Sequence, residues 1–284
     1  MYKKLLVFIL IVLSLVFVSC NNNKEESDKL TVAVTIVPQE TFVKAVCGDL
    51  VNVVVVVPPG SSPETYEPTS REIAAFHKSS IYFAIGMPVE DVSIFPIVED
   101  TKVIKLHEIV SKEHEDLFFE GEERDQHIWL SPKRAKVMVK TIAEEMAKLD
   151  PDNREIYEAN CEKYIQELDK VDEEIKEILK DVKNRKFIVF HPAFGYFAAD
   201  YDLTMYSLEE EGKEATPKRL EELIDLAKKE NIKAIFYQSE VDSSQSKAFA
   251  EEIGGKTIML SPLAKDYTDN LEKMAKLIAE ANNG

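Results

Sequence analysis

The longest regular pattern of apolar and polar positions in the chain runs from Pro151 to about Lys183. Apolar side chains recur there at alternating steps of four and three residues, and Glu, Lys and Asp occupy most positions between them. Asp150, Pro151 and Asp152 are typical of a helix start, and neither Gly nor Pro follows for about thirty residues. The pattern predicts one long helix with a narrow apolar seam, formed by Tyr157, Cys161, Tyr164, Leu168, Val171, Ile175, Ile178 and Val182.

Such a seam has two interpretations. It could form a coiled coil with another chain, because four heptads suffice for one. It could also be a strut that lies across two lobes of the same molecule. Strand-like and helix-like patterns flank the segment on both sides, which favours the strut and a monomer.

Short apolar runs rich in β-branched residues alternate with helical patterns on either side of this helix. Alternation of this kind predicts parallel sheets covered by helices. We therefore expect an α/β protein with two lobes, each a roughly four-stranded parallel sheet flanked by helices, joined by one long rigid backbone helix. The predicted strands are residues 30–37, 51–57, 81–86 and 102–106, then 187–191, 203–207, 233–238 and 256–260.

The segments between these strands complete the predicted layout. The charged stretch from Glu108 to Gln126 has little apolar periodicity and is interpreted as a loop. The predicted organisation is a signal peptide (1–19), a lipidated tether (20–29), an N-terminal lobe (30–150), the linking helix (151–184) and a C-terminal lobe (185–284).

The first twenty residues form an export signal. Lys3 and Lys4 precede an apolar run of about fourteen residues, which is short for a membrane span. Residues 17–20 resemble a bacterial lipobox and end at Cys20, so we expect lipidation of Cys20 and an extracytoplasmic protein anchored to the membrane. The alternative is an apolar run that is retained as an anchor helix.

Composition narrows the set of partners. The chain has 284 residues, of which 45% are apolar and 31% charged, and a formal net charge of −17. A strongly acidic protein is poorly suited to bind nucleic acid. Cys47 and Cys161 fall on apolar helix positions and are expected to be buried thiols.

Residues that could bind a ligand follow several of the predicted strands. Ligands bind at the carboxyl ends of parallel strands, and with two lobes these ends can face each other across a cleft. Glu64, His127 and His191 occupy such positions, as do Gln238 and Glu240. Imidazoles together with carboxylates suit a borderline divalent metal. Spacing alone leaves open that each histidine is only a structural hydrogen-bonding residue.

Four segments make the chain resemble the metal-binding proteins of ABC-type zinc and manganese importers, in the cluster with a helical backbone between the lobes. The resemblance extends from about residue 30 to residue 281. It implies a solute-binding protein that delivers metal to an ABC permease. The four segments are residues 59–68 (PGSSPETYEP), 126–132 (QHIWLSP), 190–197 (FHPAFGYF) and 235–240 (IFYQSE).

The resemblance also implies a ligand set, with two departures. The second and third ligands of the family fall on His127 and His191. The first ligand, usually histidine, falls on Glu64, and the fourth, commonly aspartate, falls on Ser261. We expect Glu240 to replace the missing aspartate, while Gln238 could offer a neutral oxygen.

This set predicts zinc as the preferred metal, with manganese close behind and iron still open. Two imidazoles favour zinc in a four-coordinate site, whereas a carboxylate in place of an imidazole moves the site toward manganese. Two other classes of function compete with transport. A zinc-dependent metalloenzyme of the cell envelope would leave one metal position open, and a surface adhesin would need only the long helix. No short motif for a catalytic base or nucleophile supports an enzyme.

Replacement of Cys20 by Ser should release the protein into the soluble fraction, because the predicted lipid would then have no attachment point. Fractionation of cells that express the parent and Cys20→Ser measures this directly. A variant that stays with the membrane would show that the apolar run is retained.

Overall fold

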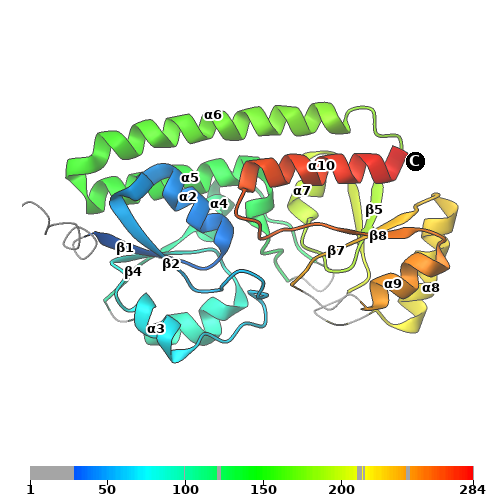
Figure 1. Ribbon diagram of the computed structural model, residues 1–284, viewed down its shortest axis with the longest axis horizontal. Coiled ribbons are helices and arrows are strands. Elements are labelled where there is room, and N and C mark those ends of the chain that lie inside the picture. Colours follow the sequence, from blue (N-terminus) through cyan, green and yellow to red (C-terminus); the bar gives the residue numbers. More distant parts are fainter. Residues whose placement is uncertain are drawn as a thin grey trace, which may run out of the picture.

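The computed structural model describes residues 29–98, 100–119, 123–209, 213, 215–240 and 244–283. Two four-stranded parallel sheets lie at opposite ends of the molecule, with long helices above them (Figure 1). This confirms the predicted α/β architecture. The predicted signal peptide, Cys20 and the tether up to residue 28 lie outside the described residues. Within those residues, no helix combines the length and the apolar character needed to cross a bilayer.

The first sheet has the strand order β2-β1-β3-β4, and every pair is parallel. All four residues of β3 are buried, as expected for a strand covered on both faces. The carboxyl ends of the strands therefore meet at one edge, where the loop that carries Glu64 begins. The strands are β1 (Leu30–Val34), β2 (Val51–Val55), β3 (Ile81–Ala84) and β4 (Lys102–Lys105).

The second sheet repeats this topology with the order β6-β5-β7-β8. Its two faces bury different sets of side chains. Phe187, Val189 and Phe236 join the main core of the molecule, whereas Ile188 and Ile235 belong to a separate cluster with residues of α8 and α9. The strands are β5 (Lys186–Val189), β6 (Thr204–Ser207), β7 (Ala234–Tyr237) and β8 (Lys256–Met259).

Helices connect the strands and cover the sheets. Thr69 and Thr216 cap α3 and α8 by accepting hydrogen bonds from Glu72 N and Arg219 N. The helices other than α6 are α2 (Val37–Cys47), α3 (Ser70–Phe76), α4 (Leu106–Glu113), α5 (Pro132–Leu149), α7 (Gly195–Asp200), α8 (Pro217–Lys229), α9 (Ser244–Glu252) and α10 (Tyr267–Asn283). Short helical turns are η2 (Gly48–Leu50), η3 (Glu90–Ile94), η4 (Phe95–Ile97), η5 (Ile128–Leu130) and η6 (Pro151–Asn153).

The long helix is α6 (Arg154–Leu179), and it runs above both sheets (Figure 1). It packs against α2, α5 and α10 of the same chain, which supports the strut rather than a coiled coil. The helix ends at Leu179, four residues before the predicted end at Lys183. The Leu179 carbonyl accepts hydrogen bonds from Val182 N (3.3 Å) and from Arg185 Nη1 (2.8 Å), which satisfy it where the helix ends.

The predicted seam of α6 is buried along nearly its whole length. Tyr157, Leu168 and Ile175 are completely inaccessible to solvent. At the end of the helix, Leu179 takes the buried position and Ile178 is only half-buried. The thiols of Cys47 in α2 and Cys161 in α6 are free and buried, as predicted.

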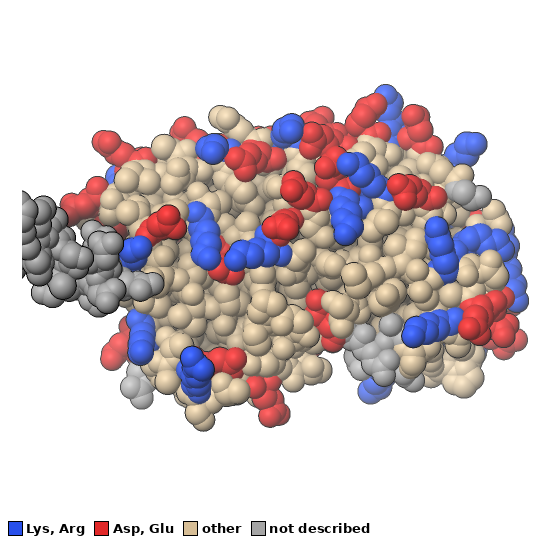
Figure 2. Space-filling model, in the orientation of Figure 1, with Lys and Arg blue, Asp and Glu red and all other residues tan. Residues whose placement is uncertain are grey.

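The opposite face of α6 carries intermingled charges (Figure 2). Lys170 and Glu174 form one i,i+4 ion pair at 3.2 Å, and Arg154 and Glu158 form another at 3.3 Å. Exposed pairs of this kind stabilise a helix by only about 0.2–0.5 kcal/mol each. This face is therefore a solvated surface rather than a seam for a second chain.

The buried face of α6 joins the lobes into one core. A single cluster of buried apolar side chains extends from Val32 and Phe83 in the first sheet, through Leu168 in α6, to Val189 and Leu260 in the C-terminal lobe. A change in the angle between the sheets would have to break this packing. The core therefore fixes the relative position of the lobes.

Polar contacts reinforce the connection beneath α6. Trp129 Nε1 donates to Pro262 O (2.8 Å), and the Tyr267 hydroxyl donates to Trp129 O (2.5 Å). Ser131 Oγ donates to Asp200 Oδ2 in α7 (2.5 Å). These bonds tie the segment after His127 to the C-terminal part of the chain.

The prediction of a loop from Glu108 to Gln126 is wrong in its first part. Residues 108–113 belong to α4, which packs against α5. Only Leu106 and Val110 of this helix are fully buried. Two buried positions in a short charged segment give too weak a periodicity to identify a helix from sequence.

Replacement of Ile175 by Ala should lower the free energy of unfolding by about 2–5 kcal/mol, because it removes a buried side chain from the seam of α6. Ile156→Ala is a matched control on the same helix, since Ile156 is 46% exposed and Ile175 is 0% exposed. Urea unfolding of both variants gives the comparison. If sedimentation instead shows a parent dimer that Ile175→Ala dissociates, the coiled coil is correct.

Candidate metal centre

Glu64 lies in the loop between β2 and α3. A turn forms this loop, in which Tyr66 N donates to Ser62 O (3.0 Å), and Gly60 adopts a positive φ of 85° that favours glycine. The loop brings Glu64 back over the carboxyl edge of the first sheet. Its side chain is 27% exposed, which makes it more accessible than either histidine beside it.

His127 precedes the short η5 turn and is held by Asp125. Asp125 Oδ1 accepts hydrogen bonds from both the backbone N (2.9 Å) and the Nδ1 (2.8 Å) of His127. Because Nδ1 carries the proton of this bond, the lone pair of a neutral ring lies on Nε2. The second carboxylate oxygen of Asp125 lies against Gly195, where any Cβ would clash with it.

His191 follows β5 in the C-terminal lobe and is held in the same way. Its Nδ1 lies 3.1 Å from Oε2 of Glu209, a buried residue just after β6. The side chain of His191 is only 6% exposed. A carboxylate on Nδ1 again leaves Nε2 as the free ligand atom, which is the usual arrangement of a metal-binding histidine.

The free atoms of these three side chains converge. Glu64 Oε1 lies 2.8 Å from His191 Nε2 and 3.5 Å from His127 Nε2, and the two Nε2 atoms are 3.3 Å apart. Among the described residues, these three form the only group of at least three His, Cys, Asp or Glu side chains whose ligand atoms all lie within 4.8 Å of one another. Two imidazole nitrogens and one carboxylate oxygen are a ligand set for zinc and related divalent metals.

Each of these three side chains also has a pKa that is shifted by at least one of the others. Burial disfavours ionisation of Glu64, but hydrogen bonds from His127 and His191 outweigh it and hold the pKa of Glu64 well below its usual range. Burial likewise disfavours a charged imidazole, yet the hydrogen bonds to Glu209 and Glu64 raise the pKa of His191 to about 9. The pKa of His127 is raised against burial by Asp125 and Glu64.

Comparison with known proteins identifies the family. The family described as "Zinc-uptake complex component A periplasmic" matches residues 32–281. The chain belongs to this family. The resemblance inferred from the four sequence segments is thereby confirmed.

Individual relatives agree with this family. The high-affinity zinc uptake system protein ZnuA of Bacillus subtilis is 31% identical over 278 residues, which cover 90% of this chain and 87% of that protein. The zinc-binding lipoprotein AdcA of Streptococcus pneumoniae R6 is 27% identical over 309 residues, which cover 99% of this chain but only 61% of AdcA. The chain therefore corresponds to about three-fifths of the length of AdcA.

Solved structures match the fold closely. A crystal structure of ZnuA has a TM-score of 0.84 at 39% identity, covering 90% of this chain and all of that one. A ZnuA deletion mutant with zinc bound has the same TM-score at 38% identity, covering 90% of this chain and 98% of that one.

The other residues singled out in the sequence lie outside the three-residue group. Glu240 is half-buried, and its Oε1 accepts a hydrogen bond from Ser239 Oγ (2.9 Å). The backbone oxygen of Ser261 accepts from Asn270 Nδ2 (2.8 Å). Gln238 is buried at the end of β7, and its Oε1 has no hydrogen-bond partner.

Sequence reasoning missed the two carboxylates that orient the histidines. Asp125 lies two residues before His127, where a short acidic side chain can accept hydrogen bonds from the backbone N–H groups that follow it. Glu209 follows β6, so a search after every predicted strand would have found it. Both residues are buried.

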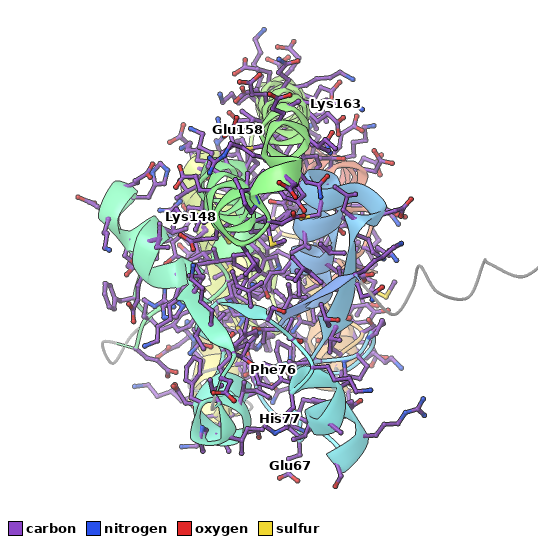
Figure 3. All side chains as sticks on the ribbon, turned by 90° about the vertical axis from the view of Figure 1, so that its left-hand side faces the viewer. Glu67, Phe76, His77, Lys148, Glu158 and Lys163 are labelled. Carbon is purple, nitrogen blue, oxygen red and sulfur yellow. The ribbon has the colours of Figure 1, made fainter. Side chains whose placement is uncertain are left out.

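The remaining histidines do not join the site. Burial, together with Arg124, lowers the pKa of His107 to about 4. His77 is exposed at the end of α3, far from Glu158 and Lys163 of α6 (Figure 3). His77 is thus a surface histidine.

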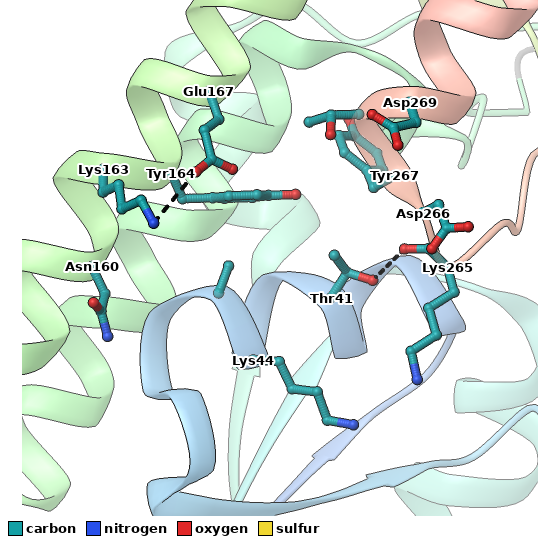
Figure 4. A pocket seen from close by; sticks show the side chains of 12 residues that line it. Thr41, Lys44, Asn160, Lys163, Tyr164, Glu167, Lys265, Asp266, Tyr267 and Asp269 are labelled. Atoms are coloured by element: carbon teal, nitrogen blue, oxygen red, sulfur yellow. Dashed lines mark hydrogen bonds and ion pairs between the residues drawn. The ribbon is translucent and has the colours of Figure 1, made fainter.

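A polar hollow of about 510 Å³ lies between α2, α6 and the start of α10 (Figure 4). Lys163 Nζ lies 3.9 Å from Glu167 Oε1, so these two charges are paired, and Thr41 Oγ1 donates to the backbone carbonyl of Lys265 (2.8 Å). Among the described residues that line it there is neither His nor Cys. It is a weaker candidate for a transition-metal site than the group around Glu64.

Zinc binding should release protons at neutral pH. The pKa of His191, about 9, leaves this imidazole protonated in the metal-free protein, and only the neutral ring can bind a metal. Zinc affinity should therefore fall progressively as the pH is lowered from about 9, and not only below about pH 6, as the reference pKa of ~6.5 suggests. Calorimetric titration in two buffers of different ionisation enthalpy counts the protons released.

Glu209→Gln is the matched control for this prediction. A neutral amide should lower the pKa of His191, so fewer protons should leave when zinc binds. In the metal-free parent, the raised pKa stabilises the folded protein below about pH 6.5, and this stabilisation is lost as the pH rises through about 9. Proton release that is zero in the parent, or unchanged in Glu209→Gln, would contradict this account.

Proposed function

We propose that the protein is an extracytoplasmic solute-binding protein that captures a divalent transition metal between its lobes and delivers it to an ABC-type permease. Glu64 and His127 from the N-terminal lobe and His191 from the C-terminal lobe bind the metal. The observation that carries the proposal is the convergence of two Nε2 atoms and one carboxylate oxygen, with each imidazole oriented by a separate buried carboxylate.

Zinc is the proposed cargo. Two imidazoles and one carboxylate match the ligand types of zinc sites, and the affinity of such a set rises from manganese toward zinc. The similar proteins AdcA, a zinc-binding lipoprotein, and ZnuA, a high-affinity zinc uptake protein, support the same choice. Manganese is the second candidate, because Glu64 supplies a carboxylate where the family usually has histidine.

The membrane partners follow from the same proposal. A protein described as one component of an uptake complex needs other components to move the metal across the membrane. We propose that lipidation of Cys20 holds the monomer near its permease. The description of AdcA as a lipoprotein supports this anchor.

His127→Ala and His191→Ala should each lower zinc affinity by more than about 100-fold, because loss of a direct ligand must exceed the roughly 10–100-fold effect of losing an outer hydrogen-bond partner. His77→Ala is the matched control, since His77 is exposed. Competition with a chromophoric zinc chelator measures all three. If the double histidine variant binds zinc as tightly as the parent, the site is elsewhere.

Glu64→His should raise the preference for zinc over manganese, because it replaces a hard oxygen ligand by imidazole. Parallel titrations of metal-stripped protein with each metal give the affinity ratio. An unchanged ratio would indicate that Glu64 does not bind the metal.

A screen of the zinc-loaded parent with generic esters and phosphates separates transport from the enzyme hypothesis, since turnover that is lost in the histidine variants would support an enzyme.

A further inference from the structure

The ladder of the second sheet continues past the ends of its strands. Glu209 N donates to Phe190 O (2.9 Å), and Phe190 N donates to Phe236 O (2.7 Å). Val189 pairs with Ser207 on one side and with Phe236 on the other. Two residues further along all three strands, this register places His191 between Glu209 and Gln238.

The alternation of side chains puts these residues on one face. Val189 and Phe236 belong to the main core, and the next pair, Phe190 and Tyr237, packs with the separate cluster on the other face. His191 and Gln238 come next and return to the face of the main core. Neighbouring strands lie about 4.8 Å apart, so continuation of this register gives His191 and Gln238 neighbouring backbone positions. The hydrogen bond between Glu209 and His191 demonstrates the same adjacency on the opposite side.

The side-chain oxygen of Gln238, at the end of β7, forms no hydrogen bond within the described part of the chain. Its side chain is only 7% exposed, and Oε1 has no hydrogen-bond partner among the described residues. Buried polar atoms are rarely left unpaired, and a bound ion is one of the recognised explanations. An amide oxygen is also a neutral ligand that a divalent metal accepts.

We infer that Gln238 supplies the fourth ligand of the metal through Oε1. This inference rests on the proposed function. Glu64, His127 and His191 then provide three ligand atoms and Gln238 the fourth, which closes a four-coordinate N2O2 site with a single anionic ligand. The closed set suits a carrier, which has to hold its cargo without leaving an open position for chemistry.

The two alternative residues fit less well. Glu240 Oε2, like Gln238 Oε1, has no hydrogen-bond partner among the described residues, but Glu240 lies outside the group of converging His, Cys, Asp and Glu ligand atoms. Ser261 follows β8, which is separated from β5 by β7. A serine hydroxyl is also not among the usual protein ligands of zinc, which are Cys, His, Asp and Glu.

A neutral fourth ligand also affects metal selection. A second carboxylate would add negative charge and hardness to the site, which favours manganese relative to zinc. Gln238 avoids this change, so it offsets the effect of Glu64 and keeps the preference of the site for zinc. Gln238→Glu should therefore raise manganese affinity more than zinc affinity.

The test compares metal-stripped parent protein with Gln238→Ala, Gln238→Met and Gln238→Glu. Zinc and manganese affinities are measured by competition, and cobalt(II) is used as a spectroscopic probe of coordination. Gln238→Ala and Gln238→Met should each lower zinc affinity about tenfold or more and change the visible d–d bands of bound cobalt. Gln238→Glu should retain zinc binding and shift the preference toward manganese. Glu240→Ala and Ser261→Ala, as matched controls, should leave both affinities and the cobalt spectrum unchanged.

The outcomes separate this inference from the function on which it rests. Gln238→Met preserves length and packing, so a folded variant with the parent's zinc affinity and cobalt spectrum would overturn the role of Gln238. A large loss in Glu240→Ala, with none in Gln238→Met, would assign the fourth position to Glu240 instead. If His191→Ala in the same series also binds zinc like the parent, the proposed function itself fails.

Discussion

The packing of apolar side chains along the buried face of α6 is the constraint on which the rest of the structure depends. This face contributes to a core that extends without interruption from the first sheet to the second. Because close-packed interiors do not deform continuously, the angle between the lobes is fixed by the same contacts that stabilise the fold. His127 and His191 come from different lobes, yet their Nε2 atoms lie 3.3 Å apart. The site is therefore prepared by the fold before any metal arrives.

Bringing three ionisable side chains together in a buried place costs free energy, and the hydrogen bonds around them offset this cost. Two imidazoles and a carboxylate are buried together, and each charge would be costly alone. In the structure, Glu64 pairs with His191, while Asp125 and Glu209 hold the outer nitrogens of the two rings. A metal can take the place of the shared proton without rearrangement of these partners. Under the proposed function, capture and release would depend on exchange between metal and protons, and on access past Glu64, rather than on a large hinge motion.

The sequence predicted the features that depend on local pattern. Apolar runs identified all eight strands, and the alternating seam identified α6 and its buried face. The pattern missed α4 because only Leu106 and Val110 are fully buried in it. It extended α6 to Lys183 because the hydrogen bonds from Val182 N and Arg185 Nη1 to the Leu179 carbonyl, where the helix ends, have no helix-end signal in the sequence. Similarly, the neighbours of His191 depend on the strand order β6-β5-β7-β8, which periodicity does not encode. For that reason the sequence alone does not show that Glu209 lies beside His191.

The most direct test of the central claim is a crystal structure of the zinc-loaded protein, with anomalous diffraction measured at the zinc edge. The account predicts one strong peak between the lobes, bonded at about 2.0–2.2 Å to Glu64, His127 and His191. It also predicts that α6 and the two sheets keep the relative positions they have in the metal-free protein. A peak away from these three side chains, or a bound form in which the sheets have rotated about α6, would contradict it.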